Sequence, residues 1–155
     1  MTFRITGLSP EPFRHLFGLS AEELERYGAK RYVADATSAY PDRIEIRDAQ
    51  PGESLLLLNY THQPADTPYQ AKFAIFVREG AETAYDRIGE VPQAMRRRMI
   101  SLRGFDADHM LVKAELADGK VLEGSVEGLF ANPRIAYIQA HYAAPGCYAA
   151  RIDRA

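Results

Sequence analysis

The sequence is poor in cysteine and has no tryptophan: Cys147 is the single thiol among 155 residues. One cysteine cannot form a disulfide within the chain, so nothing indicates an oxidising compartment. No apolar run approaches the roughly 20 residues that span a membrane, and the amino-terminal residues lack the apolar core of a signal peptide. We therefore expect a cytoplasmic protein without a membrane partner.

An excess of charge of one sign is also missing. Lys and Arg number 19 against 21 Asp and Glu, a formal net charge of −2, whereas nucleic-acid-binding proteins normally carry a basic face. The basic run at 96–98 is more typical of a solvated helix surface than of a phosphate site. The chain has no glycine-rich phosphate loop, nucleophile elbow or zinc-binding cysteine pair. The sequence thus predicts neither a nucleic-acid partner nor a cofactor.

The apolar and charged fractions, 46% and 26%, are those of an ordinary globular protein. A chain of this length forms about one domain and buries roughly two-thirds of its unfolded surface. Without internal repeats or a linker-like stretch, we expect a single domain over residues 1–155.

The centre of this domain is predicted from residues 53–78. Four consecutive leucines at 55–58 lie between Pro51-Gly52 and Pro64, and a short unbroken apolar run is typical of a strand buried on both faces. A second apolar run follows at 73–77. We predict that these two runs form the central strands of the sheet.

Helices are predicted near the amino terminus. Ser9-Pro10 begins one, which Gly18 ends, and Ser20 with Glu23 forms a capping box that begins the next. Gly28 stands where a helix cap is expected. These residues predict a helical hairpin, and Pro92 begins one later short helix.

Further strands are expected at 2–6, 31–34, 43–47, 99–105, 110–116, 135–142 and 147–153. Those at 43–47 and 110–116 are predicted from alternating polar and apolar residues. Asp118-Gly119 allows two interpretations. We favour a tight hairpin that pairs Leu116 with Val121. The alternative is the start of a helix, which the spacing of the apolar residues at 122–130 supports and Gly124 and Gly128 weaken. Strands thus outnumber helices and follow one another. The expected fold is α+β, a largely antiparallel sheet with the helical hairpin and the short helix packed on it.

Polar residues at the ends of these strands are the candidate ligand-binding groups. Tyr60 and His62 share one face of the leucine strand, at its carboxyl end. If the terminal hairpin lies beside this strand, His141 and Tyr148 converge with them. An imidazole titrates near neutral pH, so His62 is the expected proton carrier, with Arg43 or Arg78 available to hold an anionic group.

Cys147 lies in the same hairpin as His141, and such a pair is the minimum for a thiolate nucleophile. A four-residue turn at 143–146 places His141 opposite Tyr148 and on the other face from Cys147, whereas a three-residue turn unites the pair. We favour the longer turn and thus a buried thiol. Asp106 or Asp108 with two histidines could ligate a metal, but no tight ligand spacing supports such a site.

Two functional interpretations remain open. The first is a domain that binds a small polar or anionic ligand near His62 and His141, with no reaction assigned. The second is a non-catalytic module that self-associates as a homodimer. Tyr137, Tyr142 and Tyr148 make the terminal hairpin rich in aromatic residues and motivate this alternative.

A recognisable pattern is carried by the segments 55–65, 68–69, 75–80, 102–103, 106–108, 129–133, 145–149 and Arg151. Through these segments nearly the whole chain resembles a bacterial family catalogued as domain of unknown function 1203. This resemblance implies a single small domain of uncharacterised role and transfers no catalytic residue. The resemblance also implies a cysteine after Tyr40-Pro41, where this chain has Asp42. A redox pair with Cys147 is therefore excluded here.

Overall fold

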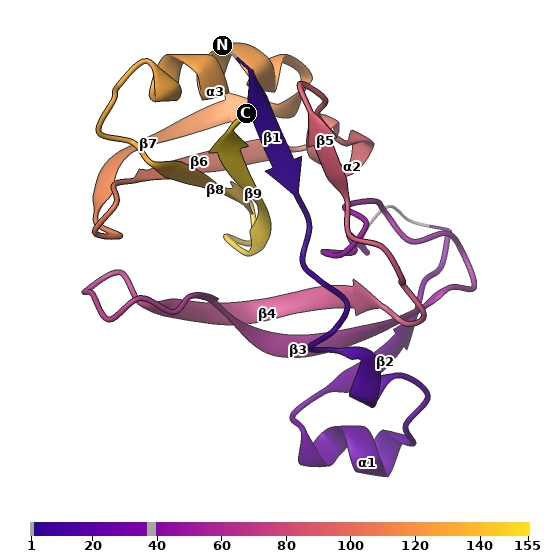
Figure 1. Ribbon diagram of the computed structural model, residues 1–155. Coiled ribbons are helices and arrows are strands. Elements are labelled where there is room, and N and C mark those ends of the chain that lie inside the picture. The colour runs from indigo at the N-terminus through magenta and orange to yellow at the C-terminus, as the bar shows by residue number, and fades with distance from the viewer. Residues whose placement is uncertain (1, 37–39) are drawn as a thin grey trace.

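Two antiparallel sheets make up the computed structural model, which describes residues 2–36 and 40–155. The smaller sheet lies below the larger one in Figure 1. The larger sheet has the strand order β5 (Asp86–Ile88), β1 (Phe3–Thr6), β9 (Tyr148–Arg154), β8 (Tyr137–Tyr142), β6 (Met99–Phe105) and β7 (Leu111–Asp118). The smaller sheet has the order β2 (Lys30–Val33), β3 (Ser54–Gln63) and β4 (Ala71–Arg78). The helices are α1 (Ala21–Arg26), α2 (Gln93–Arg96) and α3 (Leu122–Phe130). None of the helices in the described ranges is long and apolar enough to cross a membrane.

The leucine run forms the middle strand of the smaller sheet, as predicted. Leu55 and Leu56 are fully buried and Leu58 nearly so. The prediction that the next strand is also central is wrong, because β4 is an edge of this three-stranded sheet. An apolar run shows that a strand is buried but not what buries it. In β4, Ile75 and Val77 are buried by packing against other side chains and not by a second neighbouring strand.

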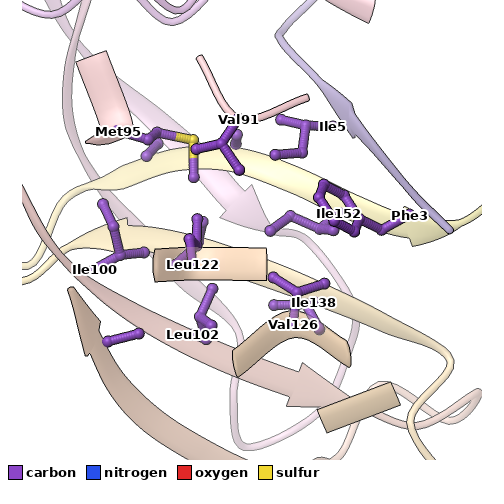
Figure 2. Packing of buried hydrophobic residues seen from close by; sticks show 14 of the residues in the cluster. Phe3, Ile5, Val91, Met95, Ile100, Leu102, Leu122, Val126, Ile138 and Ile152 are labelled. Carbon is purple, nitrogen blue, oxygen red and sulfur yellow. The ribbon is translucent and has the colours of Figure 1, made fainter. Parts of the chain in front are cut away.

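The larger sheet has one apolar face, which holds most of the core. α2 and α3 cover this face. Figure 2 shows the buried side chains that pack between these helices and the sheet. The residues labelled there are Phe3, Ile5, Val91, Met95, Ile100, Leu102, Leu122, Val126, Ile138 and Ile152. Because side chains alternate along a strand, the remaining positions of β6, β8 and β9 project to the opposite face. β8 is buried along its whole length, so both of its faces are covered.

The predicted amino-terminal helical hairpin is not confirmed. α1 has the predicted capping box of Ser20 and Glu23, and Gly28 adopts the expected positive φ of 68°. The segment before it forms only turns and a 3-10 helix at Arg14–Leu16. Pro12 and the break at Gly18 leave too few residues for a helix to nucleate.

The favoured hairpin at Asp118-Gly119 is wrong, and the helical alternative is right. The backbone of Gly119 lies so close to α2 that an added Cβ would be 1.9 Å from the carbonyl oxygen of Met95. This close passage directs the chain into α3, which closes the apolar face of the larger sheet. A Cβ added at Gly124 would meet open space. This glycine therefore lowers the stability of α3 only through its poor helix propensity.

Residues 43–47 do not form the predicted strand. Ile44 and Ile46 are both buried and Ile46 has a φ of 49°, so the segment is irregular and its apparent alternation does not separate two faces. A missed strand, β5, has three exposed residues and pairs with β1, which is too short to give a sequence pattern. The other predicted strands overlap β1, β2, β6, β7, β8 and β9.

Candidate functional site

The two histidines at the ends of different sheets meet in the space between them. His62 ends β3 of the smaller sheet and His141 lies on β8 of the larger one, yet their ring centroids are 4.8 Å apart. Tyr148 stacks on His62 at 5.8 Å and meets His141 edge-on. Tyr60 packs against Tyr148 at 6.2 Å. The terminal hairpin therefore converges with β3 by packing face to face rather than by pairing beside it.

Gln139 joins the two imidazoles. Its side-chain Nε2 donates to the carbonyl oxygen of His62 at 2.8 Å, which fixes the orientation of the amide. The amide oxygen then faces Nδ1 of His62 at 3.0 Å and Nε2 of His141 at 3.3 Å. Since this oxygen only accepts, both imidazole nitrogens must carry hydrogen to bond with it. His62 thus directs Nδ1–H at Gln139, and its Nε2 is the nitrogen left for a ligand.

His141 faces hydrogen-bond acceptors with both ring nitrogens. Its Nδ1 lies 3.0 Å from the carbonyl oxygen of Gly146, opposite the contact with Gln139. A neutral imidazole has one N–H, so both contacts can be hydrogen bonds only in the imidazolium form. Burial opposes this form and, with the charge of Arg103, lowers the pKa of His141 to about 3. At neutral pH His141 is therefore neutral and carries a single N–H. It can donate to only one of its two acceptors, Gln139 or Gly146, at a time.

Arg103 places a positive charge beside this group. It lies on β6 directly opposite Gln139, is half-buried, and burial lowers its pKa. Its side chain makes one long hydrogen bond, 3.4 Å to Ser101 Oγ, and no ion pair with a carboxylate of residues 2–36 or 40–155. Burial also lowers the pKa of His62; the hydrogen bond with Gln139 opposes this shift, and the charge of Arg103 adds to it.

Two cavities open beside these residues, and His62 and Gln139 line both. The larger, of about 390 Å³, also reaches Arg103. The smaller, of about 260 Å³, is bordered by Tyr137 and Arg151. Gln139 and Arg103 were not predicted from the sequence. For Gln139 a signal was available, because it stands two residues before His141 on the same predicted strand and so shares its face. Arg103 lies on β6, and placing it beside Gln139 required the pairing of β6 with β8.

The other candidate residues lie elsewhere. The four-residue turn is confirmed, because His141 pairs with Tyr148, so Cys147 is on the other face of the hairpin and forms no dyad with His141. Arg43 lies with Cys147, to which its Nη2 donates at 2.9 Å. Arg78 is bound to carboxylates, with Nη2 at 2.5 Å from Glu45. The predicted ligand set is thus divided between two faces of β8 and β9.

The basic run at 96–98 forms ion pairs. Arg96 pairs with Glu123, and Arg98 binds Asp48 at 2.6 Å, with Arg97 at 3.6 Å from the same carboxylate. This run therefore has carboxylate partners of its own. Among the described residues, no three metal-binding side chains gather into a group.

The three tyrosines that motivated self-association are buried. Tyr137, Tyr142 and Tyr148 are exposed by 4%, 2% and 5%, so they form no surface patch. The homodimer remains a prediction, but it is no longer supported by an aromatic surface patch. The molar mass measured by light scattering would test it.

Comparison with known proteins identifies the family to which the chain belongs. A family model described as a protein of unknown function, DUF1203, matches residues 39–154, which include His62, Arg103, Gln139 and His141. No curated protein and no solved structure matches the chain. The match spans most of the chain, and the protein belongs to the DUF1203 family.

Proposed function

We propose that the protein binds a small oxyanion in the space between the two sheets, beside His62 and His141. The observation that supports this is Arg103, a half-buried guanidinium without a carboxylate partner in the described part of the chain. Taking a charge out of water is costly unless an opposite charge or good hydrogen bonds replace the lost hydration. A bound anion supplies both, and the 390 Å³ cavity in front of Arg103 offers the room.

The imidazoles supply the second half of the site. His62 Nε2 is left for a ligand once Nδ1 points at Gln139, and it becomes a donor when the ring is protonated. An anion within about 4–6 Å favours the charged form of a histidine. Anion binding therefore brings one proton onto His62, while His141 stays neutral because burial lowers its pKa to about 3.

Sulfate is the probe for this proposal, because its charge does not change between pH 5 and 8. Binding is measured by calorimetry at constant ionic strength, since salt screens such contacts. We expect the affinity to rise as the pH falls, by up to tenfold per pH unit while the histidines are neutral in the free protein. Calorimetry in buffers of different ionisation enthalpy should report uptake of about one proton.

Arg103→Gln should weaken sulfate binding by about tenfold or more, because hydrogen bonds to charged groups contribute roughly 1.5–3 kcal/mol. Arg134→Gln is the matched control, since Arg134 is an exposed arginine outside the site. Equal sulfate affinity in the two variants would refute the role of Arg103. Binding that does not depend on pH would refute the part played by the histidines.

A further inference from the structure

A mainly apolar cavity in the described part of the protein is separate from the histidine group. It has a volume of about 540 Å³ and lies between β4 and the turn at 143–146. Its walls are mainly apolar side chains, among them Leu57, Ile75, Phe76 and Met99. Pockets of this size, with mainly apolar walls and a few placed polar groups, are typical of small-molecule sites. The polar groups here are Arg43, Arg98, Tyr142 and Cys147.

Arg43 is a buried charge without a counterion. Its side chain is 2% exposed, and its guanidinium donates to the carbonyl oxygens of Tyr148, at 2.7 Å, and of Pro41, and to Cys147 Sγ at 2.9 Å. A guanidinium has five N–H donors, so two are left over. No carboxylate of the described residues pairs with it. The adjacent Asp42 instead accepts the backbone N–H groups of Glu45 and Arg78, at 2.6 and 2.7 Å.

Tyr142 adds an unused donor at the same place. Two guanidinium groups lie near its ring, with the carbon of Arg43 and that of Arg98 each 5.1 Å from the ring centroid. The side chain is 2% exposed, and its hydroxyl has no hydrogen-bond partner among residues 2–36 and 40–155. A buried polar group without a partner is rare in proteins and costs about 1–3 kcal/mol. A ligand oxygen next to Arg43 would remove this cost.

The charges around the cavity fix the charge of the ligand. Arg98 is matched by Asp48, with two bonds of 2.6 and 3.1 Å, so the positive charge in excess at the wall is that of Arg43. One negative charge balances it. A dianion would leave a second charge against apolar walls, which is unfavourable in a medium of low polarity.

We propose that this cavity binds a monocarboxylate with an apolar body. The carboxylate takes the spare N–H groups of Arg43 and the hydroxyl of Tyr142, and the apolar body lies against Leu57, Ile75 and Met99. This site shares no residue with the proposed oxyanion site, because Tyr142 and Cys147 face away from His141. The two proposals can therefore fail independently.

Octanoate is the probe, and its neutral counterpart 1-octanol is the control for the charge. Calorimetry should show that octanoate binds at least tenfold more tightly than octanol, because only the anion bonds to Arg43 and Tyr142. From butanoate to octanoate, each added methylene should raise the affinity by up to about fourfold, the equivalent of about 0.8 kcal/mol per buried CH₂. Octanoate that does not bind, or that binds no better than octanol, would overturn the proposal.

Tyr142→Phe tests the site without removing a bond that the fold uses. We expect this variant to be as stable as the wild type or slightly more so, since the hydroxyl has no partner, and to bind octanoate about tenfold more weakly. Tyr85→Phe is the matched control, because the hydroxyl of Tyr85 donates to the carbonyl oxygen of Glu90 at 3.2 Å and lies outside both sites. It should bind octanoate as the wild type does. Equal affinity in the two variants would remove Tyr142 from the site.

Cys147 reports where the ligand lies, because it lines the cavity and is the single thiol of the chain. Iodoacetamide should alkylate the folded protein slowly, and saturating octanoate should slow the reaction at least fivefold, as read by mass spectrometry. Octanol at the same concentration should give little protection. A thiol that reacts equally fast with and without octanoate would show that the ligand does not occupy this cavity.

Discussion

Because of His141, the free energy of unfolding of this protein should decrease as the pH is lowered from 7.5 to 5. Its pKa is about 3 in the folded protein, against an ordinary value of 6.5 in an unfolded chain. The unfolded state therefore binds a proton over this range and the folded state does not. The sign follows from linkage: stability is fully present above pH 6.5 and decreases as the pH falls toward 3.

The size of the effect follows from the same two values. Each pKa unit corresponds to 1.36 kcal/mol, so the full difference amounts to about 5 kcal/mol, most of it at pH values below 5. Between pH 7.5 and 5 the loss is about 2 kcal/mol. That is a large part of the 5–15 kcal/mol by which proteins are usually stable. His62, whose pKa burial also lowers, adds to the loss in the same direction.

Urea unfolding at several pH values between 7.5 and 5, without sulfate, measures this loss. The lower limit matters because Glu53 and Glu79, whose pKa values are about 2, add their own losses below about pH 4.5. His141→Gln should lower stability at pH 7.5 but flatten its pH dependence, whereas the exposed His15→Gln should leave that dependence unchanged. A wild type whose unfolding free energy is constant over this range, or a His141→Gln variant with the wild-type slope, would show that His141 is not held neutral by burial.

Three further substitutions test how the fold is held together. Glu79→Gln should cost about 2 kcal/mol in urea unfolding, because the carboxylate accepts from the backbone N–H of Gly18 at 2.8 Å and from Arg31 at 2.6 Å; the highly exposed Glu22→Gln should have no measurable effect, and equal effects would contradict the reasoning. Gly119→Ala should cost at least about 3 kcal/mol, since its Cβ would meet the carbonyl oxygen of Met95 at 1.9 Å. Gly124→Ala in α3, where the Cβ meets open space, should instead raise stability by about 0.5–1 kcal/mol, and a loss of stability there would contradict the assigned position of that glycine.

Local patterns predicted the parts of the fold that local interactions determine. The leucine strand, the capping box at Ser20 and the four-residue turn before Cys147 all depend on residues close in sequence. The division into two sheets could not be predicted in this way, because an apolar run shows that a strand is buried but not what buries it. β4 is covered by packing on one face and remains an edge.

The helix α3 shows where intrinsic propensity was outweighed. Gly124 and Gly128 argued for a hairpin, yet the apolar face of the larger sheet needed a cover, and Leu122 and Val126 supply it with no remaining exposure. Helical spacing of apolar residues was the better guide, since packing energies exceed the propensity cost of a glycine, about 1 kcal/mol.

The candidate site was predicted in part. The placement of His62 and His141 at strand ends suggested that they meet, and their rings are 4.8 Å apart. Arg103 was missed because its place depends on the pairing of β6 with β8, between residues more than 30 positions apart. Gln139 shares a face with His141 by simple alternation along β8, but its bonds to His62 depend on how the two sheets pack. Arg43, expected near the histidines, instead donates to the carbonyl oxygen of Tyr148 and to Cys147, contacts between residues more than 100 positions apart that no local pattern predicts.

The two proposed sites share one physical basis, which is an arginine that lacks a carboxylate. Ten arginines of the described residues form ion pairs with Asp or Glu, and the chain has more acidic than basic residues, so carboxylates are not scarce. Arg43 and Arg103 are nevertheless withdrawn from water without one, on opposite faces of the hairpin formed by β8 and β9. If each arginine binds its own anion, Arg103→Gln should weaken the binding of sulfate and leave that of octanoate unchanged. Tyr142→Phe should weaken the binding of octanoate and leave that of sulfate unchanged. Loss of both ligands in either variant would show one coupled site instead of two.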